Sequence, residues 1–143
     1  MAIAALRKME LRAIDIKCAY LQSSFDDAPG LTFEEVYLDQ FPGYELLNVD
    51  GTKKQAPDGK RLVLLLQRPL YGLKTSGRYW FEALDASLNK MGFTSAGGDD
   101  CLFVRGNHNE ETYCALAVYV DDIMLLTPST SIADSFLIEL GTF

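Results

Sequence analysis

The chain has 143 residues, of which 48% are hydrophobic and 23% charged, and its formal net charge is −7. This length suits one α+β or α/β domain with an apolar core, and no stretch approaches the roughly 20 apolar residues of a membrane span. The negative charge argues against an autonomous nucleic-acid binder, because such proteins are usually basic. It leaves room for a catalytic subdomain that holds metal ions while neighbouring domains hold a nucleic-acid backbone.

The first half of the chain predicts short strands separated by loops. A strand-like run begins at Leu11 and carries Asp15. Residues 22–32 are rich in Ser, Asp, Pro and Gly, which predicts a loop. Further along, the sequence predicts a short strand over residues 36–38, a polar insertion over 48–59 and a buried strand over 62–66.

The second half predicts helices and a hairpin. A helix follows Thr75 or Ser76, either of which can cap its start, and Gly92 is a suitable stop. Apolar residues at helical spacing predict its buried face: Trp80, Leu84, Leu88 and Met91. Later elements are a strand over 101–104, a turn over 107–111, a hairpin over 112–126 and a helix over 132–140.

The three cysteines are odd in number and widely spaced. Cys18, Cys101 and Cys114 lie in apolar or strand-like surroundings, which predicts reduced core thiols. A disulfide or zinc framework is not indicated, and free thiols are typical of a reducing compartment inside a cell.

Asp121 and Asp122 lie between two apolar runs, residues 114–120 and 123–126. Each run predicts a buried strand, and the pair falls where a tight turn would join them. Two like charges at such a tip repel each other, and water or a cation must compensate them. A solvated turn remains one interpretation, since Asp is a common turn residue. Magnesium is the other, because it prefers carboxylate oxygens.

A third carboxylate, Asp15, interrupts another strand-like run. It is either an exposed residue of an alternating strand or a member of one acidic cluster with Asp121 and Asp122. Such a cluster can hold two magnesium ions about 3.5–4 Å apart, one activating an attacking hydroxyl and one stabilising the leaving oxygen. Phosphoryl transfer needs little more than this.

The motifs, taken together, resemble one family. DIKCAYL at residues 15–21 is similar to the first catalytic motif of reverse transcriptases, and YVDD at 119–122 to their Tyr-x-Asp-Asp hairpin. LYGLK at 70–74, followed by RYW at 78–80, resembles a segment of copia-type retrotransposon polyproteins. VYLDQFPG at 36–43 and DCLFV at 100–104 resemble further segments of it. The resemblance covers roughly residues 10–140 in the family's order.

The resemblance implies roles for the matching residues. Asp15 and Asp121 would be the main ligands of two Mg²⁺ ions, with Mn²⁺ as an alternative, and Asp122 would complete the cluster. Tyr20 would lie under the incoming sugar and exclude a 2′-hydroxyl, although plain core packing remains open. The segment around Gly72 would approach the nucleotide and template closely, and its neighbours that would contact them are Tyr71 and Lys74. Arg78 is either part of this surface or an ordinary helix charge.

The resemblance also implies an architecture and partners. Residues 1–143 would form a partial reverse transcriptase domain: an α+β, palm-like antiparallel sheet backed by helices, with truncated fingers and no thumb. Its activity would be RNA-directed DNA synthesis inside the cell, in a cytoplasmic particle or the nucleus. Expected partners are an RNA or DNA template with its primer, deoxynucleoside triphosphates, and the remaining polyprotein domains (fingers, thumb, ribonuclease H and integrase); no membrane is expected. A catalytically inactive remnant and a non-catalytic palm-like binding module stay as alternatives.

Two features are interpreted as decoys. Gly98-Asp99-Asp100 copies a viral polymerase signature, but no apolar run precedes it, so a turn is expected. His108 lies in a polar turn and is expected to be solvated. Basic residues gather over 53–78, where an ordinary solvated face and a functional strip are both open: Lys53, Lys54, Lys60, Arg61, Arg68, Lys74 and Arg78.

Overall fold

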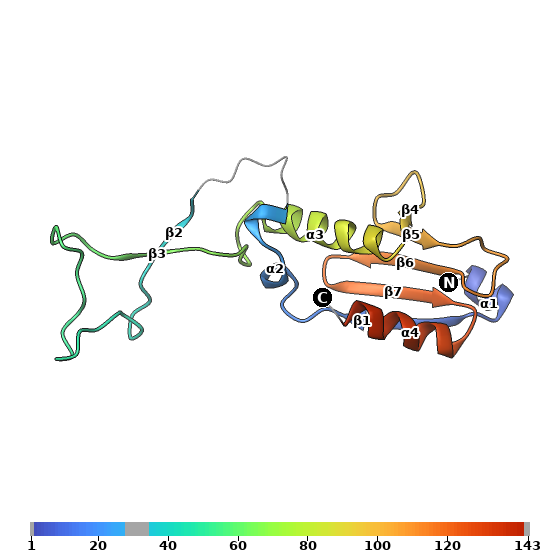
Figure 1. The fold of residues 1–143 in the computed structure, drawn as a ribbon, viewed down its shortest axis with the longest axis horizontal. Helices are drawn as coiled ribbons and strands as arrows, with labels where there is room; N and C mark the ends of the chain where they lie inside the picture. Colours follow the sequence, from blue (N-terminus) through green and yellow to red (C-terminus); the bar gives the residue numbers. More distant parts are fainter. Residues whose placement is uncertain (1, 28–34, 142–143) are drawn as a thin grey trace.

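A five-stranded antiparallel sheet forms the body of the protein (Figure 1). The structure is a computed structural model and describes residues 2–27 and 35–141. The spatial order of the strands is β1-β7-β6-β5-β4. Their bounds are β1 Glu10–Asp15, β4 Thr94–Ser95, β5 Leu102–Arg105, β6 Cys114–Tyr119 and β7 Asp122–Thr127. The α+β class predicted from the sequence is confirmed.

Two helices cover one face of this sheet. They are α3, Ser76–Lys90, and α4, Thr130–Leu140. Alternate strand residues such as Leu116 and Ile123 form the core with Leu88 of α3 and Phe136 of α4, and each of these is at most 1% exposed. The predicted face of α3 is confirmed for Trp80, Leu84 and Leu88, whereas Met91 lies just past the helix and is partly buried. Gly92 follows with a φ of 83°, a conformation that favours glycine.

The other face of the sheet is open. Residues on β6 and β7 alternate between buried and exposed, so only half of each predicted buried strand is in the core. The exposed positions on this face are mostly apolar or small: Leu11, Ala13, Leu102, Ala117 and Met124. Among the described residues, no helix is long and apolar enough to cross a membrane.

Shorter elements complete the described chain: α1 Ala2–Arg7, α2 Ala19–Gln22, the 3₁₀ turn η1 Phe25–Asp27, β2 Tyr37–Asp39 and β3 Val63–Leu65. The predicted loop over 22–32 lies partly outside the described residues, and its described part contains η1.

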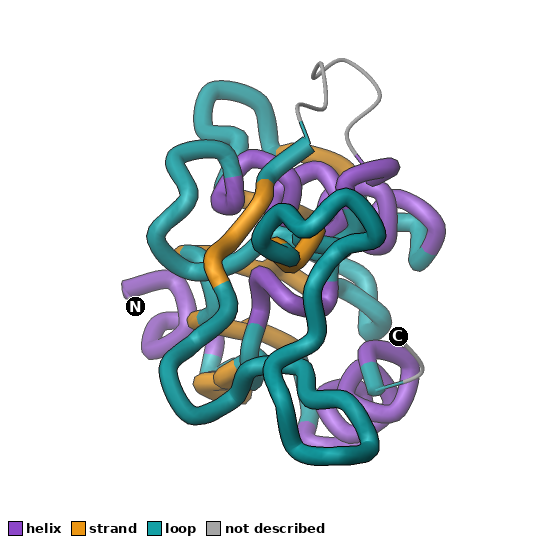
Figure 2. The backbone as a smooth tube through the Cα atoms, turned by 90° about the vertical axis from the view of Figure 1, so that its left-hand side faces the viewer, coloured by secondary structure: helices purple, strands orange, loops and turns teal. Residues whose placement is uncertain are grey.

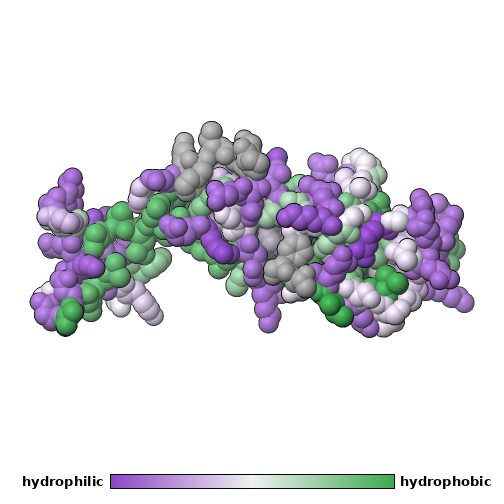
Figure 3. All heavy atoms as spheres, viewed as in Figure 1, coloured by the Kyte–Doolittle hydropathy of each residue, from purple (hydrophilic) through white to green (hydrophobic). Residues whose placement is uncertain are grey.

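Strands β2 and β3 form a separate antiparallel pair midway along an arm that extends away from the body (Figure 1). Figure 2 views the chain along this arm, from its outer end. The strand predicted over 62–66 is present as β3, but the prediction that it is buried is wrong, because the side chains of Val63 and Leu65 are each more than 40% exposed. Apolar side chains follow the arm in the space-filling view (Figure 3). Three of the basic residues of this region pair with acids of the same arm: Lys53 with Glu45, Lys60 with Asp58, and Arg61 with Asp39.

Arg105 ties both helices to the sheet. Its guanidinium donates to the carbonyl of Met91 at 3.0 Å, just past the end of α3, and to Glu139 of α4 at 2.8 Å. It also lies 4.7 Å from the centre of the Phe93 ring. The positive charge therefore compensates the free carbonyls at a helix C-terminus, and the guanidinium also lies over an aromatic ring.

The cysteines differ from one another, which corrects the prediction of three core thiols. Cys114 is buried, whereas Cys18 and Cys101 are exposed, and all three are free. Burial raises the pKa of the Cys114 thiol, with nearby Arg105 acting in the opposite direction.

This difference gives a test of the fold. With iodoacetamide at pH 8, Cys18 and Cys101 should be alkylated quickly and Cys114 at least about tenfold more slowly, because the reactive thiolate is both rare and enclosed there. Peptide mass spectrometry over time measures the three rates. In denaturant the three rates should converge, and equal rates in the native protein would contradict the placement of β6 in the core.

Candidate catalytic site

The pairing of β1 with β7 brings two of the predicted site residues together. Its register places Asp15 directly opposite Asp122. Directly opposite residues of an antiparallel pair share one face of the sheet, with Cβ atoms roughly 4.5–5.5 Å apart. Buried and exposed side chains alternate along both strands, and Asp15 and Asp122 are at exposed positions. The two carboxyl groups therefore project from the open face, away from α3 and α4.

Asp121 lies in the two-residue turn that joins β6 to β7. The register pairs Tyr119 with Asp122, which leaves Val120 and Asp121 as the central residues of the turn. The carbonyl of Asp121 accepts a hydrogen bond from the Ile16 amide at 2.8 Å, just past the end of β1. This hydrogen bond connects the turn to the end of β1. The backbone of Asp121 therefore lies beside the backbone of the paired residues Asp15 and Asp122.

Val120 has a φ of 56°, in the left-handed region that a β-branched residue rarely adopts. Its carbonyl accepts a hydrogen bond from the indole nitrogen of Trp80 at 2.6 Å. From the sequence, Trp80 is expected on the buried face of the helix and within a segment that resembles the family, with no role in the site. The one available signal was general: a buried indole N–H needs a hydrogen-bond acceptor.

The donor set fits magnesium in its chemistry, since carboxylate oxygens are the ligands that Mg²⁺ prefers. Within residues 2–27 and 35–141, no three His, Cys, Asp or Glu side chains stand close enough together to hold one ion by themselves. Magnesium is commonly bound by one or two carboxylates, with water and substrate phosphates supplying the other ligands. The facing pair Asp15 and Asp122 matches that pattern.

Two tyrosines lie beside the turn. Tyr20 of α2 and Tyr71 of the loop before α3 have ring centres 4.4 Å apart and planes tilted by 33°. Tyr20 is half-buried, and Tyr71 is 50% exposed. Partial desolvation and, next, the negative charge of Asp121 raise the pKa of Tyr71. The structure thus brings Tyr20 and Tyr71 together near Asp121, although the sequence separates the rings by about fifty positions.

Gly72 follows Tyr71 with a φ of 100°. A Cβ atom added there would meet nothing within 4 Å, so the backbone conformation, and not crowding inside this chain, favours glycine. Lys74 is exposed in the same loop. Arg78, at the start of α3, forms an ion pair with Glu82, which matches an ordinary helix-surface charge.

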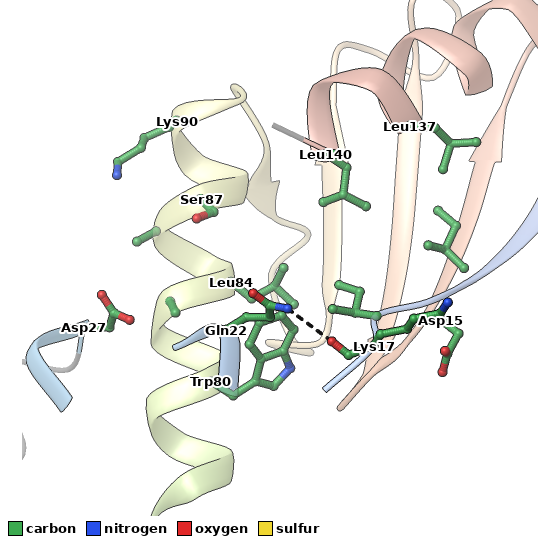
Figure 4. Close-up of a pocket in the computed structure, with 15 residues that line it drawn as sticks. Asp15, Lys17, Gln22, Asp27, Trp80, Leu84, Ser87, Lys90, Leu137 and Leu140 are labelled. Atoms are coloured by element: carbon green, nitrogen blue, oxygen red, sulfur yellow. Dashed lines mark hydrogen bonds between the residues drawn. The ribbon is translucent and has the colours of Figure 1, made fainter. Parts of the chain in front are cut away.

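Two hollows flank the end of β1. One, of 430 Å³, lies on the open face and is lined by Ala13, Asp15, Ala117, Tyr119, Asp122 and Met124. The other, of 570 Å³, lies among β1, α3 and α4, and its apolar lining includes Trp80, Leu84, Leu137 and Leu140. In that groove, Asp15 lies at the rim with its carboxylate turned away from the helices (Figure 4). The carboxylate chemistry therefore belongs to the hollow on the open face.

Both expected decoys are confirmed. Asp99 accepts a hydrogen bond from the amide of Cys101 at 2.9 Å and lies in a turn, and Asp100 is exposed beside it. His108 is exposed, and its backbone carbonyl accepts a hydrogen bond from Arg7.

Comparison with known proteins agrees with the motifs. The family model described as "Reverse transcriptase (RNA-dependent DNA polymerase)" matches residues 1–142. The Pol polyprotein of transposon RE2 from Arabidopsis thaliana is 34% identical over 87% of this chain and 7% of its own length. The putative transposon Ty5-1 protein of Saccharomyces cerevisiae is 32% identical over 89% of the chain and 35% of its own length. The Pol polyprotein of transposon TNT 1-94 from Nicotiana tabacum is 25% identical over 88% of the chain and 8% of its own length. No solved structure matches the chain.

The chain spans less than a tenth of the two Pol polyproteins and about a third of the yeast protein. The family match covers nearly the whole sequence. Of the motifs on which the resemblance rests, residues 15–21 and 119–122 meet where β1 pairs with β7, and residues 70–74 lie beside them, whereas residues 36–43 lie in the arm. The chain therefore belongs to the reverse transcriptase family and is a fragment of a copia-type retrotransposon reverse transcriptase.

Proposed function

We propose that this chain is the palm part of an RNA-directed DNA polymerase, and that it transfers nucleotides to a primer 3′-hydroxyl. The observation that carries the proposal is the register that sets Asp15 opposite Asp122 on the open face, with Asp121 in the adjoining turn. Facing carboxylates are suited to a divalent cation, which supports Mg²⁺, or Mn²⁺ in its place.

When bound, two such ions would stabilise the attacking and leaving oxygens of the transfer. The residues of the chain would bind the ions and position the substrates. Asp15 and Asp121 would be the main ligands of the cations, and Asp122, which lies opposite Asp15, would complete the cluster. Tyr20 and Tyr71 form an aromatic wall next to this cluster, and we assign them to the sugar and base of the incoming deoxynucleoside triphosphate. Lys74 and the backbone at Gly72 lie in the same loop as Tyr71 and are assigned to the nucleotide or template.

The template and primer are assigned to the open face of the sheet. Small side chains there, Ala13 and Ala117, allow a strand to approach the carboxylates closely. The net charge of −7 means that other parts of the polyprotein must supply most of the basic contacts to the phosphate backbone. This chain covers only a small share of its relatives' length, which supports the assignment of nucleic-acid binding to other segments. We assign these further segments as fingers, thumb, ribonuclease H and integrase.

The decisive substitution is Asp121→Asn. In the longer polypeptide that carries this chain, it should lower Mg²⁺-dependent primer extension at least about 100-fold, because one carboxylate of the cluster is lost. In the metal-free chain it should raise the melting temperature, since repulsion among the three aspartates is relieved. Primer extension on a defined template and thermal unfolding measure the two effects.

Asp100→Asn is the matched control, because it removes the same charge from an exposed turn. It should leave extension unchanged. Equal activity of the two variants would contradict a catalytic role for Asp121, and a wild-type polypeptide without activity would favour the inactive remnant.

Tyr20→Ala tests the aromatic wall. Removing the ring opens space beside the sugar, so the preference for deoxynucleotides over ribonucleotides should fall at least about tenfold, because exclusion by overlap is lost. Tyr20→Phe keeps the ring and its contact with Tyr71, and should preserve the preference. The ratio of kcat/KM for the two nucleotides measures it. An unchanged ratio together with a melting temperature lowered by several degrees would assign Tyr20 to packing alone.

A further inference from the structure

The turn that carries Asp121 contains a backbone conformation that is unfavourable for the residue that adopts it. Val120 has a φ of 56°, and a β-branched residue is disfavoured there by its own Cβ. Two-residue hairpin turns normally place Gly, Asn or Asp at such positions. A conformation of this kind persists only where the surrounding structure imposes it. Some contact outside the turn must therefore hold Val120.

Trp80 supplies that contact. Its indole N–H donates to the Val120 carbonyl at 2.6 Å, across 40 positions of sequence. The side chain is only 7% exposed, and it stands on α3, whose Leu84 and Leu88 are buried in the core. Figure 4 shows the indole nitrogen directed toward the strands of the sheet. The donor is thus fixed by a helix that is itself fixed to the sheet.

The second carbonyl of the turn is held from a different element. The carbonyl of Asp121 accepts from the amide of Ile16 at 2.8 Å, so the residue just past β1 holds one central residue of the turn and α3 holds the other. The two bonds add to the pairing of Tyr119 with Asp122 in restraining the path of the backbone between these residues. That path sets where the carboxyl groups of Asp121 and Asp122 stand relative to Asp15.

We propose that Trp80 is a positioning residue of the acidic cluster: its indole N–H keeps Val120 in the left-handed conformation and thereby fixes the turn that presents Asp121 and Asp122. Trp80 acts through the backbone and touches no substrate. The catalytic consequence rests on the proposed function, whereas the control of the turn by Trp80 does not.

The test of the turn uses the 143-residue chain and amide hydrogen exchange measured by NMR. Trp80→Phe keeps an aromatic ring and removes the N–H. Exchange at the Ile16 amide should accelerate at least about tenfold more than exchange at the Arg12 amide, which lies within β1 and away from the turn. Leu84→Ala, one helical turn further along the same buried face, should accelerate both amides by similar factors.

Val120→Gly provides a rescue, because glycine adopts a positive φ without strain. In the Val120→Gly background, adding Trp80→Phe should change the ratio of Ile16 to Arg12 exchange less than about twofold. Such non-additivity is expected only if the two residues act on one another. If Trp80→Phe accelerates both amides equally, or if the glycine background gives no rescue, the proposal is overturned.

The catalytic consequence is measured separately, in the longer polypeptide. Trp80→Phe should raise the Mg²⁺ concentration for half-maximal primer extension roughly tenfold, as changes behind metal-binding groups do, and Leu84→Ala should leave it unchanged. Wild-type polypeptide without any extension would refute the proposed function, while the exchange ratios would still decide the role of Trp80. Normal metal dependence in an active Trp80→Phe polypeptide would refute its link to the cluster.

Discussion

The antiparallel pairing of β1 with β7 is the interaction on which the site depends. Because side chains alternate along a strand, a slip of one residue would turn Asp15 toward the helices and Ile14 toward solvent. The apolar pair Ile14 and Ile123 faces the core in the observed register, so burial of these side chains opposes the slip. The same register that buries the isoleucines therefore sets Asp15 opposite Asp122. In this sheet, a single strand register therefore determines both the packing of the core and the geometry of the site.

The sequence predicts most of the elements because their periods are clear. The helical spacing of Trp80, Leu84 and Leu88 gives the buried face of α3, and the two apolar runs around Asp121 give the hairpin. Burial is predicted less well. An apolar run indicates a strand but does not show whether another layer covers it, and so β3 is exposed in an arm. The open face of the central sheet has the same explanation.

The site divides in a similar way. Carboxylates that interrupt apolar runs can be recognised in the sequence as candidate site residues, and the strand register places Asp15 opposite Asp122. The contact between Tyr20 and Tyr71 was not predicted as a pair, since it depends on how α2 packs beside the loop before α3. The bond from Trp80 ends on a backbone carbonyl, which carries no side-chain signature, and it depends on a turn conformation that valine does not favour.

The central claim is that the end of β1 and the β6–β7 turn form one cation site. Paramagnetic broadening by substoichiometric Mn²⁺ in the NMR spectrum of the 143-residue chain tests it most directly. Broadening should concentrate on the amides of residues 14–16 and 119–123, which the register brings together. The amides of other acidic turns, such as those at Asp99–Asp100 and Glu110–Glu111, should remain sharp. Broadening centred on those turns, or spread evenly over the acidic surface, would contradict the account.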